Sequence, residues 1–267
     1  MPHQHLDAAA LLRLYNSGMS YREIGDLYGV DLGTVRNRLI KLPEFTPRKP
    51  WTHVRRHQID EHYFDEINTP TKAYLFGLLM ADGSNIEGSC VSLDLTDREL
   101  VVLFRDELCR ARTLKLLERV RPGHKKIFAC RIKCASLSRT LARHGMVQSK
   151  THKLKYPSAV SDELACHFVR GYFDGDGCIT GAPASKTSAY LRWSFRLVGT
   201  RPFLTSVQEI LAAQVKVRSS VRPTRSVFCL AVSGNQQVVK VRDWIYGSGG
   251  PSLQRKREKF SQVLAGR

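Results

Sequence analysis

Two aspartates, Asp82 and Asp176, each precede a glycine at the end of a short apolar stretch. Both stretches predict a helix, and if the two helices run side by side, the two aspartates at their ends arrive together. Two carboxylates a few ångströms apart repel each other, and helix C-termini add partial negative charge, so such a pair is tolerable mainly when cations fill the site. Because hard oxygen ligands suit magnesium, the pair predicts a Mg²⁺ site.

The stretches that must position these aspartates, 73–85 and 167–179, carry small residues four apart on one helical face. A glycine inside a helix costs about 1 kcal/mol relative to alanine, so its presence in both helices predicts close backbone approach between them. The predicted interface residues are Gly77, Ala81, Gly171 and Gly175. We expect Gly83 and Gly177 to adopt the left-handed conformation that ends a helix and turns the chain away.

The segments 75–83 (LFGLLMADG) and 169–177 (VRGYFDGDG) resemble the LAGLIDADG motif of homing endonucleases. The two copies are 94 residues apart (176 minus 82), and strand-like segments follow each, which is typical of the monomeric type with two motifs in one chain. The copies depart from the motif at Met80, where the second copy has Asp174, and at Arg170, which replaces a small residue. Neither departure falls on the aspartates expected to bind metal.

The resemblance implies a metal-dependent endonuclease that hydrolyses both DNA strands across the minor groove of a long, asymmetric target. The implied metal ligands are Asp82, Asp176 and the backbone carbonyls of Ala81 and Gly175, with Mg²⁺ as cofactor and Mn²⁺ as a substitute. The alternative is a pair of capping aspartates without catalysis.

The same resemblance implies further catalytic residues. The family keeps a basic residue near each site, which corresponds to Lys150 and Lys256 in this sequence. Either lysine could polarise the scissile phosphate or simply anchor a phosphate. The family also has a polar position just after the second β-strand of each half. It corresponds to Asp97 in the first half and to Gly199 in the second, so we expect unequal cleavage rates on the two DNA strands.

The composition favours a nucleic-acid partner. Among 267 residues, 42 Lys and Arg stand against 24 Asp and Glu, a net charge of +18. A ribosomal or generally adhesive basic protein is the bland alternative. No apolar run approaches the roughly 20 residues that span a bilayer, and the N-terminus lacks a signal-peptide core, so we expect an intracellular, cytoplasmic protein without a membrane partner. Seven cysteines without framework spacing predict reduced thiols rather than disulfides or zinc.

The N-terminal residues 1–45 resemble a helix-turn-helix DNA-binding domain. Asp7 is placed to cap a first helix, Ser20 with Glu23 forms a capping box for the second, and Ile24, Leu27, Val30, Val35 and Leu39 are the expected core. Side chains of the third helix suit phosphates and base edges, namely Arg36, Asn37, Arg38 and Lys41. The alternative is a helical appendage that merely packs.

The residues 46–66 are predicted to form a basic linker. Its candidate DNA contacts are Arg48, Lys49, Arg55 and Arg56. Three prolines and several basic residues between 41 and 57 indicate an extended segment that tracks the DNA backbone or serves as a plain solvated tether.

Each of the segments 67–160 and 161–267 shows the order helix, hairpin, helix, hairpin, helix. We expect an α+β protein in which two pseudo-twofold-related LAGLIDADG repeats form an antiparallel β saddle, joined to the small all-α helix-turn-helix domain. Strands are expected over 91–96, 114–121, 126–134, 192–197 and 215–222, and a helix from 97 to about 111. The predicted DNA-reading side chains on the strands are Ser92, Asp94, Lys115, Arg119, Arg121, Arg131, Lys133, Arg192, Ser194, Arg196, Lys216, Arg218 and Arg222.

The expected partner is double-stranded DNA. A non-cleaving DNA-binding regulator is one alternative, because relatives that join a helix-turn-helix to this fold exist in which the acids are lost. Both acids remain in this sequence, which argues against it. An RNA maturase that assists the splicing of an intron RNA is the other alternative.

Overall fold

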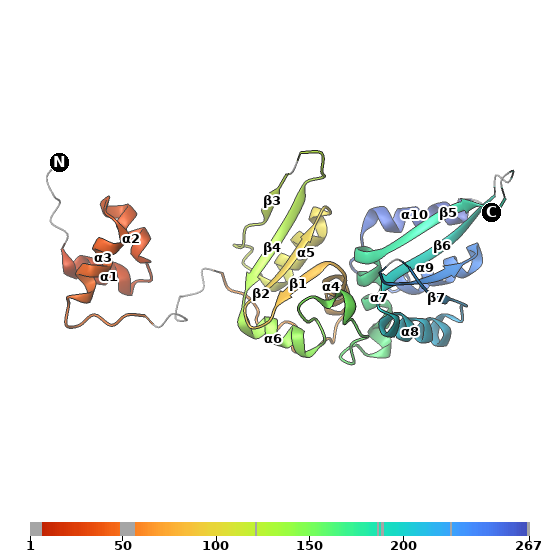
Figure 1. Ribbon diagram of the computed structural model, residues 1–267, viewed down its shortest axis with the longest axis horizontal. Helices are drawn as coiled ribbons and strands as arrows, with labels where there is room; N and C mark the ends of the chain where they lie inside the picture. The colour runs from red at the N-terminus through yellow and green to blue at the C-terminus, as the bar shows by residue number, and fades with distance from the viewer. Residues whose placement is uncertain are drawn as a thin grey trace. The chain divides into compact units, whose positions relative to one another are not determined.

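The computed structural model describes residues 7–48, 57–120, 122–185, 187, 190–224 and 226–265. The chain divides into two compact units, Met1–Arg56 and His57–Arg267 (Figure 1). No helix among the described residues is long and apolar enough to cross a lipid bilayer.

The first unit contains three short helices, α1 (Ala8–Asn16), α2 (Tyr21–Tyr28) and α3 (Leu32–Ile40). Local sequence fixes their starts. The Asp7 side chain accepts a hydrogen bond from the Ala9 amide, and Ser20 and Glu23 form the reciprocal capping box that their spacing predicts. Helix α2 ends at Gly29, whose φ of 66° lies in the left-handed region that glycine tolerates best.

The core of this unit is made by Leu11, Tyr15, Ile24, Val35 and Leu39. The prediction that Leu27 belongs to this core is wrong, because its side chain is 62% exposed. Leu11 and Tyr15 of α1 belong to this core instead.

The second unit repeats one order of elements. Its first half contains α4 (Pro70–Asp82), β1 (Gly83–Ile86), β2 (Cys90–Leu95), α5 (Arg98–Leu108), β3 (Leu117–Arg119), β4 (Ile127–Lys133) and α6 (Ala135–Arg143). Its second half contains α7 (Ala165–Asp176), β5 (Gly177–Pro183), β6 (Leu191–Gly199), α8 (Arg201–Ile210), β7 (Ser220–Pro223), β8 (Phe228–Ser233), α9 (Asn235–Tyr246) and the additional α10 (Gln254–Ala265). Short 3₁₀ turns at Lys150–His152 and Asp162–Leu164 join the halves, and a π-helical turn, Leu211–Val215, follows α8.

Each half folds its four strands into an antiparallel sheet with the same connectivity, β1-β2-β4-β3 and β5-β6-β8-β7. The registers also correspond, because Gly83 pairs with Leu93 in the first sheet and Gly177 pairs with Leu197 in the second. Figure 1 shows α4 and α7 between the two sheets. The predicted α+β class with two repeats of one topology is confirmed.

Helices α4 and α7 pack closely enough to require glycine at two positions. A Cβ atom on Gly77 would lie 2.1 Å from the carbonyl oxygen of Phe168, and one on Gly171 would lie 1.9 Å from that of Tyr74. Gly77 therefore faces the residue three positions before Gly171 (171 minus 168), and Gly171 faces the residue three positions before Gly77 (77 minus 74). A twofold relation between the two helices requires this reciprocal arrangement. Backbone contact at this distance leaves no space for any side chain.

The predicted left-handed helix ends are wrong. Gly83 has φ −71° and Gly177 has φ −93°, both extended, because α4 and α7 lead directly into β1 and β5. Glycine is needed there for lack of space, since a Cβ would lie 2.6 Å from the Leu79 carbonyl oxygen at the first position and 2.2 Å from the Phe173 ring at the second.

Three predicted element boundaries also need correction. The strands expected over 114–121 and 215–222 are shorter in the structure, where they are β3 and β7. Strand β7 starts later than expected because it follows a π-helical turn and Lys216 has φ 57°. Helix α5 ends at Leu108 rather than near 111, because Cys109 has φ −129° and ψ 79°, which lie outside the helical region.

Candidate active site

The close packing of α4 and α7 brings Asp82 and Asp176 to one point. At the end of the contact, a Cβ on Gly175 would lie 2.4 Å from the Ala81 Cβ and 2.7 Å from Asp82 Oδ2. The two small residues therefore let the last turns of the helices meet, and the carboxylates emerge on the open side. Among the described residues, neither carboxylate forms a hydrogen bond or an ion pair within the protein.

Both carboxylates are open to solvent, but surrounding protein removes part of their hydration. This desolvation, together with the charge of Asp176, raises the pKa of Asp82 to about 6. Desolvation also raises the pKa of Asp176, while Lys150 and Lys256 oppose that rise. Two ionised carboxylates at this point are therefore unfavourable without additional positive charge.

The donor set fits a magnesium-type cation. Among the described residues, no cluster of three or more His, Cys, Asp or Glu could hold a metal ion, so the protein offers two carboxylates and nearby carbonyls. Mg²⁺ is commonly held by one or two carboxylates with substrate phosphates and water completing its shell. The Ala81 carbonyl is not contacted by either lysine, whereas the Gly175 carbonyl accepts a hydrogen bond from Lys256 Nζ at 3.1 Å.

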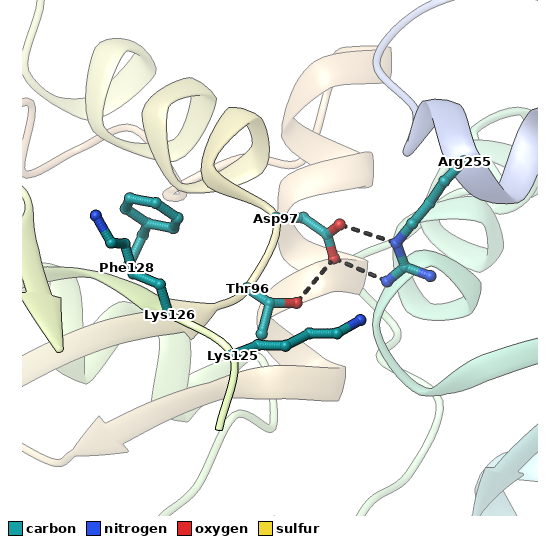
Figure 2. A pocket seen from close by; sticks show the side chains of 6 residues that line it. All are labelled: Thr96, Asp97, Lys125, Lys126, Phe128 and Arg255. Carbon is teal, nitrogen blue, oxygen red and sulfur yellow. Dashed lines mark hydrogen bonds and ion pairs between the residues drawn. The ribbon is translucent and has the colours of Figure 1, made fainter. Parts of the chain in front are cut away.

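Asp97 lies in an ion pair. The Arg255 guanidinium at the start of α10 donates to both carboxylate oxygens of Asp97, from Nε and Nη2, at 2.8 Å each. Figure 2 shows this pair beside a pocket that Lys125, Lys126 and Phe128 also line. The hydrogen bonds from Arg255 hold the pKa of Asp97 below its usual range, so Asp97 is a charged group already matched by a cation.

Arg170, which departs from the motif, and Asp174, which matches it, are both buried and have partners that sequence reasoning did not assign. Asp174 Oδ2 accepts hydrogen bonds from the Tyr74 hydroxyl (2.8 Å) and the Leu253 amide (2.7 Å). Arg170 has no exposed surface and donates to the Ile245 carbonyl (2.5 Å). The sequence signal was their position inside an apolar helix, where buried charge requires partners.

On the second sheet, the charged side chains of the four strands are all arginines. Arg192, Arg196 and Arg222 are exposed. Ser194 is only 7% exposed and lies within hydrogen-bond distance of Ser233 Oγ (3.3 Å) and Arg196 Nε (3.4 Å). Arg196 pairs across the strands with Cys178, two residues after Asp176, so this basic face adjoins the carboxylates.

The first sheet carries both basic and acidic side chains. Arg131 and Lys133 are exposed on β4, opposite Ser92 and Cys90. Asp94 is partly buried and forms an ion pair with Arg119 at 3.4 Å, which reduces the free positive charge of this sheet. Three further predicted contacts, Lys115, Lys216 and Arg218, are exposed but lie in coil before β3 and β7 rather than on the strands.

In the first unit, the predicted reading residues of α3 and its end are exposed, namely Arg36, Asn37, Arg38 and Lys41. Arg48 instead packs on its own unit. Its guanidinium lies 3.8 Å from the Tyr15 ring centroid and donates to the carbonyls of Gly18 and Met19 at 3.0 Å each. The predicted contacts Lys49, Arg55, Arg56 and Arg121 lie outside the described residues.

Comparison with known proteins yields similarity of structure only. No protein-family model and no curated protein sequence matches this chain. The structure of the meganuclease I-SmaMI bound to uncleaveable DNA is similar over 74% of this chain and 88% of that one, with a TM-score of 0.51 and 9% identity. The LAGLIDADG homing endonuclease I-GzeII in complex with its DNA target is similar over 74% and 89%, with a TM-score of 0.50 and 8% identity. About three quarters of this chain therefore has the LAGLIDADG homing-endonuclease fold.

Proposed function

We propose that this protein is a site-specific endonuclease that hydrolyses both strands of a long, asymmetric DNA duplex, with Asp82 and Asp176 as its divalent-metal ligands. The observation that carries the proposal is the meeting of two carboxylates, without protein partners, at the ends of two glycine-packed helices. Each helix leads into a sheet with exposed basic side chains, and the net charge of +18 suits a polyanion. The DNA present in the I-SmaMI and I-GzeII structures supports a duplex as the partner.

The chain's own residues would bind and align the scissile phosphates. Asp82 and Asp176 would hold Mg²⁺ or Mn²⁺, and the raised pKa of Asp82 means that acid competes with the cation below about pH 6. When bound, a divalent cation supplies positive charge against the negative charge that develops on the phosphoryl oxygens. Arg192, Arg196 and Arg131 would hold the flanking duplex through phosphates and base edges.

The first unit is proposed as a helix-turn-helix module that adds a second contact with the same DNA. Its exposed Arg36, Asn37 and Arg38 on α3 support this role. A single chain supplies both aspartates, which supports a monomer. An intron RNA is a second polyanion that the same basic surface could bind.

A non-cleaving DNA-binding regulator is the second candidate, and one observation favours it. Lys256 Nζ contacts the carbonyl of Gly175, which the resemblance assigns to the metal shell, so one expected ligand is engaged within the protein. The regulator would bind a specific duplex through the same surfaces and leave it intact with either metal.

The test is selective cleavage of a DNA library by the full chain with Mg²⁺ or Mn²⁺, followed by sequencing of the new ends. We expect one family of cut sites, lost with metal chelation and with the Asp82→Asn, Asp176→Asn double variant. Asp162→Asn is the matched control, because this exposed aspartate lies outside the centre and should leave cutting unchanged. Tight, selective binding without cleavage would replace the endonuclease with the regulator.

A further inference from the structure

The two lysines near the carboxylate pair, Lys150 and Lys256, have different surroundings. Lys256, on the first turn of α10, is 8% exposed. Its Nζ lies within hydrogen-bond distance of four backbone carbonyls at the end of α7, those of Phe173 (2.6 Å), Asp174 (2.8 Å), Gly175 (3.1 Å) and Gly177 (2.7 Å). An ammonium has three protons to donate. The carbonyls therefore use all of its donor capacity.

The carbonyls of Asp174 and Gly175 belong to the last turn of α7, where a helix leaves its carbonyls without internal partners, whereas the Phe173 carbonyl also accepts the Gly177 amide and Gly177 begins β5. A lysine there satisfies them and matches the partial negative charge of the helix end. The Lys256 side chain therefore caps the C-terminus of α7, and it holds the turn that carries Asp176.

Lys150 has a much freer ammonium. Its Nζ donates to the Gly83 carbonyl and to no other group among the described residues. The side chain is half-buried, and both Asp82 and Asp176 lie close enough to act on its charge. Two of its three protons are therefore available to a phosphate beside the carboxylates.

The segment around Lys256 also holds the two repeats together. The Leu253 amide donates to Asp174 Oδ2, and Arg255 forms its two hydrogen bonds with Asp97 of the first repeat. Phe260 and Val263 of α10 are buried in the core of the unit. The start of α10 is thereby fixed to the end of α7 and to the turn before α5.

We propose that Lys256 is a positioning residue that caps α7, and that Lys150 alone among the lysines of the centre contacts a scissile phosphate, so the two DNA strands are cut one after the other. The strand order rests on the proposed endonuclease function. The capping role rests only on contacts within the protein.

The first experiment tests the cap without DNA or metal. The intact protein is acetylated with an N-hydroxysuccinimide ester, and each lysine is followed by mass spectrometry. We expect Lys256 to react at least about tenfold more slowly than Lys150 and than Lys259, which is exposed on the same helix. Equal rates for Lys256 and Lys150 would overturn the proposed cap. Lys256→Met should also lower the Tm of the folded protein by about 5 °C, because several buried carbonyls lose their donor, against about 1 °C for Lys150→Met.

The second experiment separates positioning from contact with DNA. A selected target duplex carries a different fluorophore on each strand, and single-turnover rates are measured for both strands. Lys150→Met should slow one strand about a hundredfold and let nicked DNA accumulate. Lys256→Met should slow both strands by a common factor and leave their ratio unchanged. A change in only one strand with Lys256→Met would assign Lys256 to the substrate and refute the proposal. If the wild-type protein cuts no DNA, the proposed function fails, while the acetylation rates still decide the capping role.

Discussion

Substituting Gly175 with alanine adds one methyl group at the point where α4 and α7 meet. The new Cβ would lie 2.4 Å from the Ala81 Cβ and 2.7 Å from Asp82 Oδ2. Carbon atoms in contact normally lie about 3.5–4.0 Å apart, so the helix ends must separate by about 1 Å or the Asp82 carboxylate must rotate away. Overpacking of this size lowers the free energy of unfolding by about 1–3 kcal/mol, and the better helix propensity of alanine offsets about 1 kcal/mol of that loss.

We therefore expect Gly175→Ala to lower stability by about 1 kcal/mol, a fall in Tm of about 2–4 °C. Cleavage should fall about a hundredfold, since a misplacement near 1 Å is enough for such a loss. Thermal unfolding monitors the first effect, and single-turnover cleavage by folded protein monitors the second.

The double variant Ala81→Gly, Gly175→Ala is the matched control, because it moves the methyl group from one helix to the other. It should recover most of the lost stability, while the 2.7 Å approach to Asp82 Oδ2 keeps cleavage below the wild-type rate. A Gly175→Ala single variant as stable and as active as the wild type would refute the close packing from which the carboxylate pair was derived.

Three further predictions concern packing, pH and the first unit. Gly171→Ala should cost more than 3 kcal/mol in thermal unfolding, because its Cβ would lie 1.9 Å from a backbone carbonyl of α4 that cannot rotate away. Burial, and then the charge of Arg170, lower the pKa of His167 in the folded protein, so its stabilising contribution is complete above the unfolded pKa of about 6.5 and is lost as pH falls below it. Denaturant unfolding at pH 7.5 and pH 5.5 should show that the free energy of unfolding falls less on acidification for His167→Gln than for the wild type. Equal falls in the two proteins would contradict this. Arg48→Ala should destabilise the first unit by about 1 kcal/mol, whereas Arg36→Ala should leave its unfolding unchanged and weaken DNA binding, as electrophoretic mobility shifts would report.

Much of the fold could be predicted because its signals are local or repeated. Small residues four apart, as at Gly77 and Ala81, indicated the helix contact, and alternating polarity indicated the sheets. The capping box of Ser20 and Glu23 needs no tertiary information. Gly83 was misinterpreted because lack of space and positive φ both select glycine, and only the neighbouring Leu79 carbonyl distinguishes them.

The contacts on either side of the carboxylate pair depend on where α10 lies, which is far along the chain from their partners. Asp97 and Arg255 are 158 residues apart, and Lys256 lies 81 residues from Gly175. Nothing in the local sequence distinguishes a lysine that caps a helix from one that contacts a phosphate, so Lys150 and Lys256 are equivalent in sequence and different in the structure. Arg170 likewise shows only as a charge within an apolar helix, and its partners His167 and Ile245 come from the packing.

We propose that Asp82 and Asp176 act together in metal-dependent cleavage of a DNA duplex. The most direct measurement compares wild-type protein with Asp82→Asn, Asp176→Asn protein on a library-selected duplex, with Mg²⁺ and with chelator. We expect cuts in both strands for the wild type with Mg²⁺ only, and full binding without cutting for the double variant. Undiminished cutting by the double variant would contradict a shared role of the two aspartates.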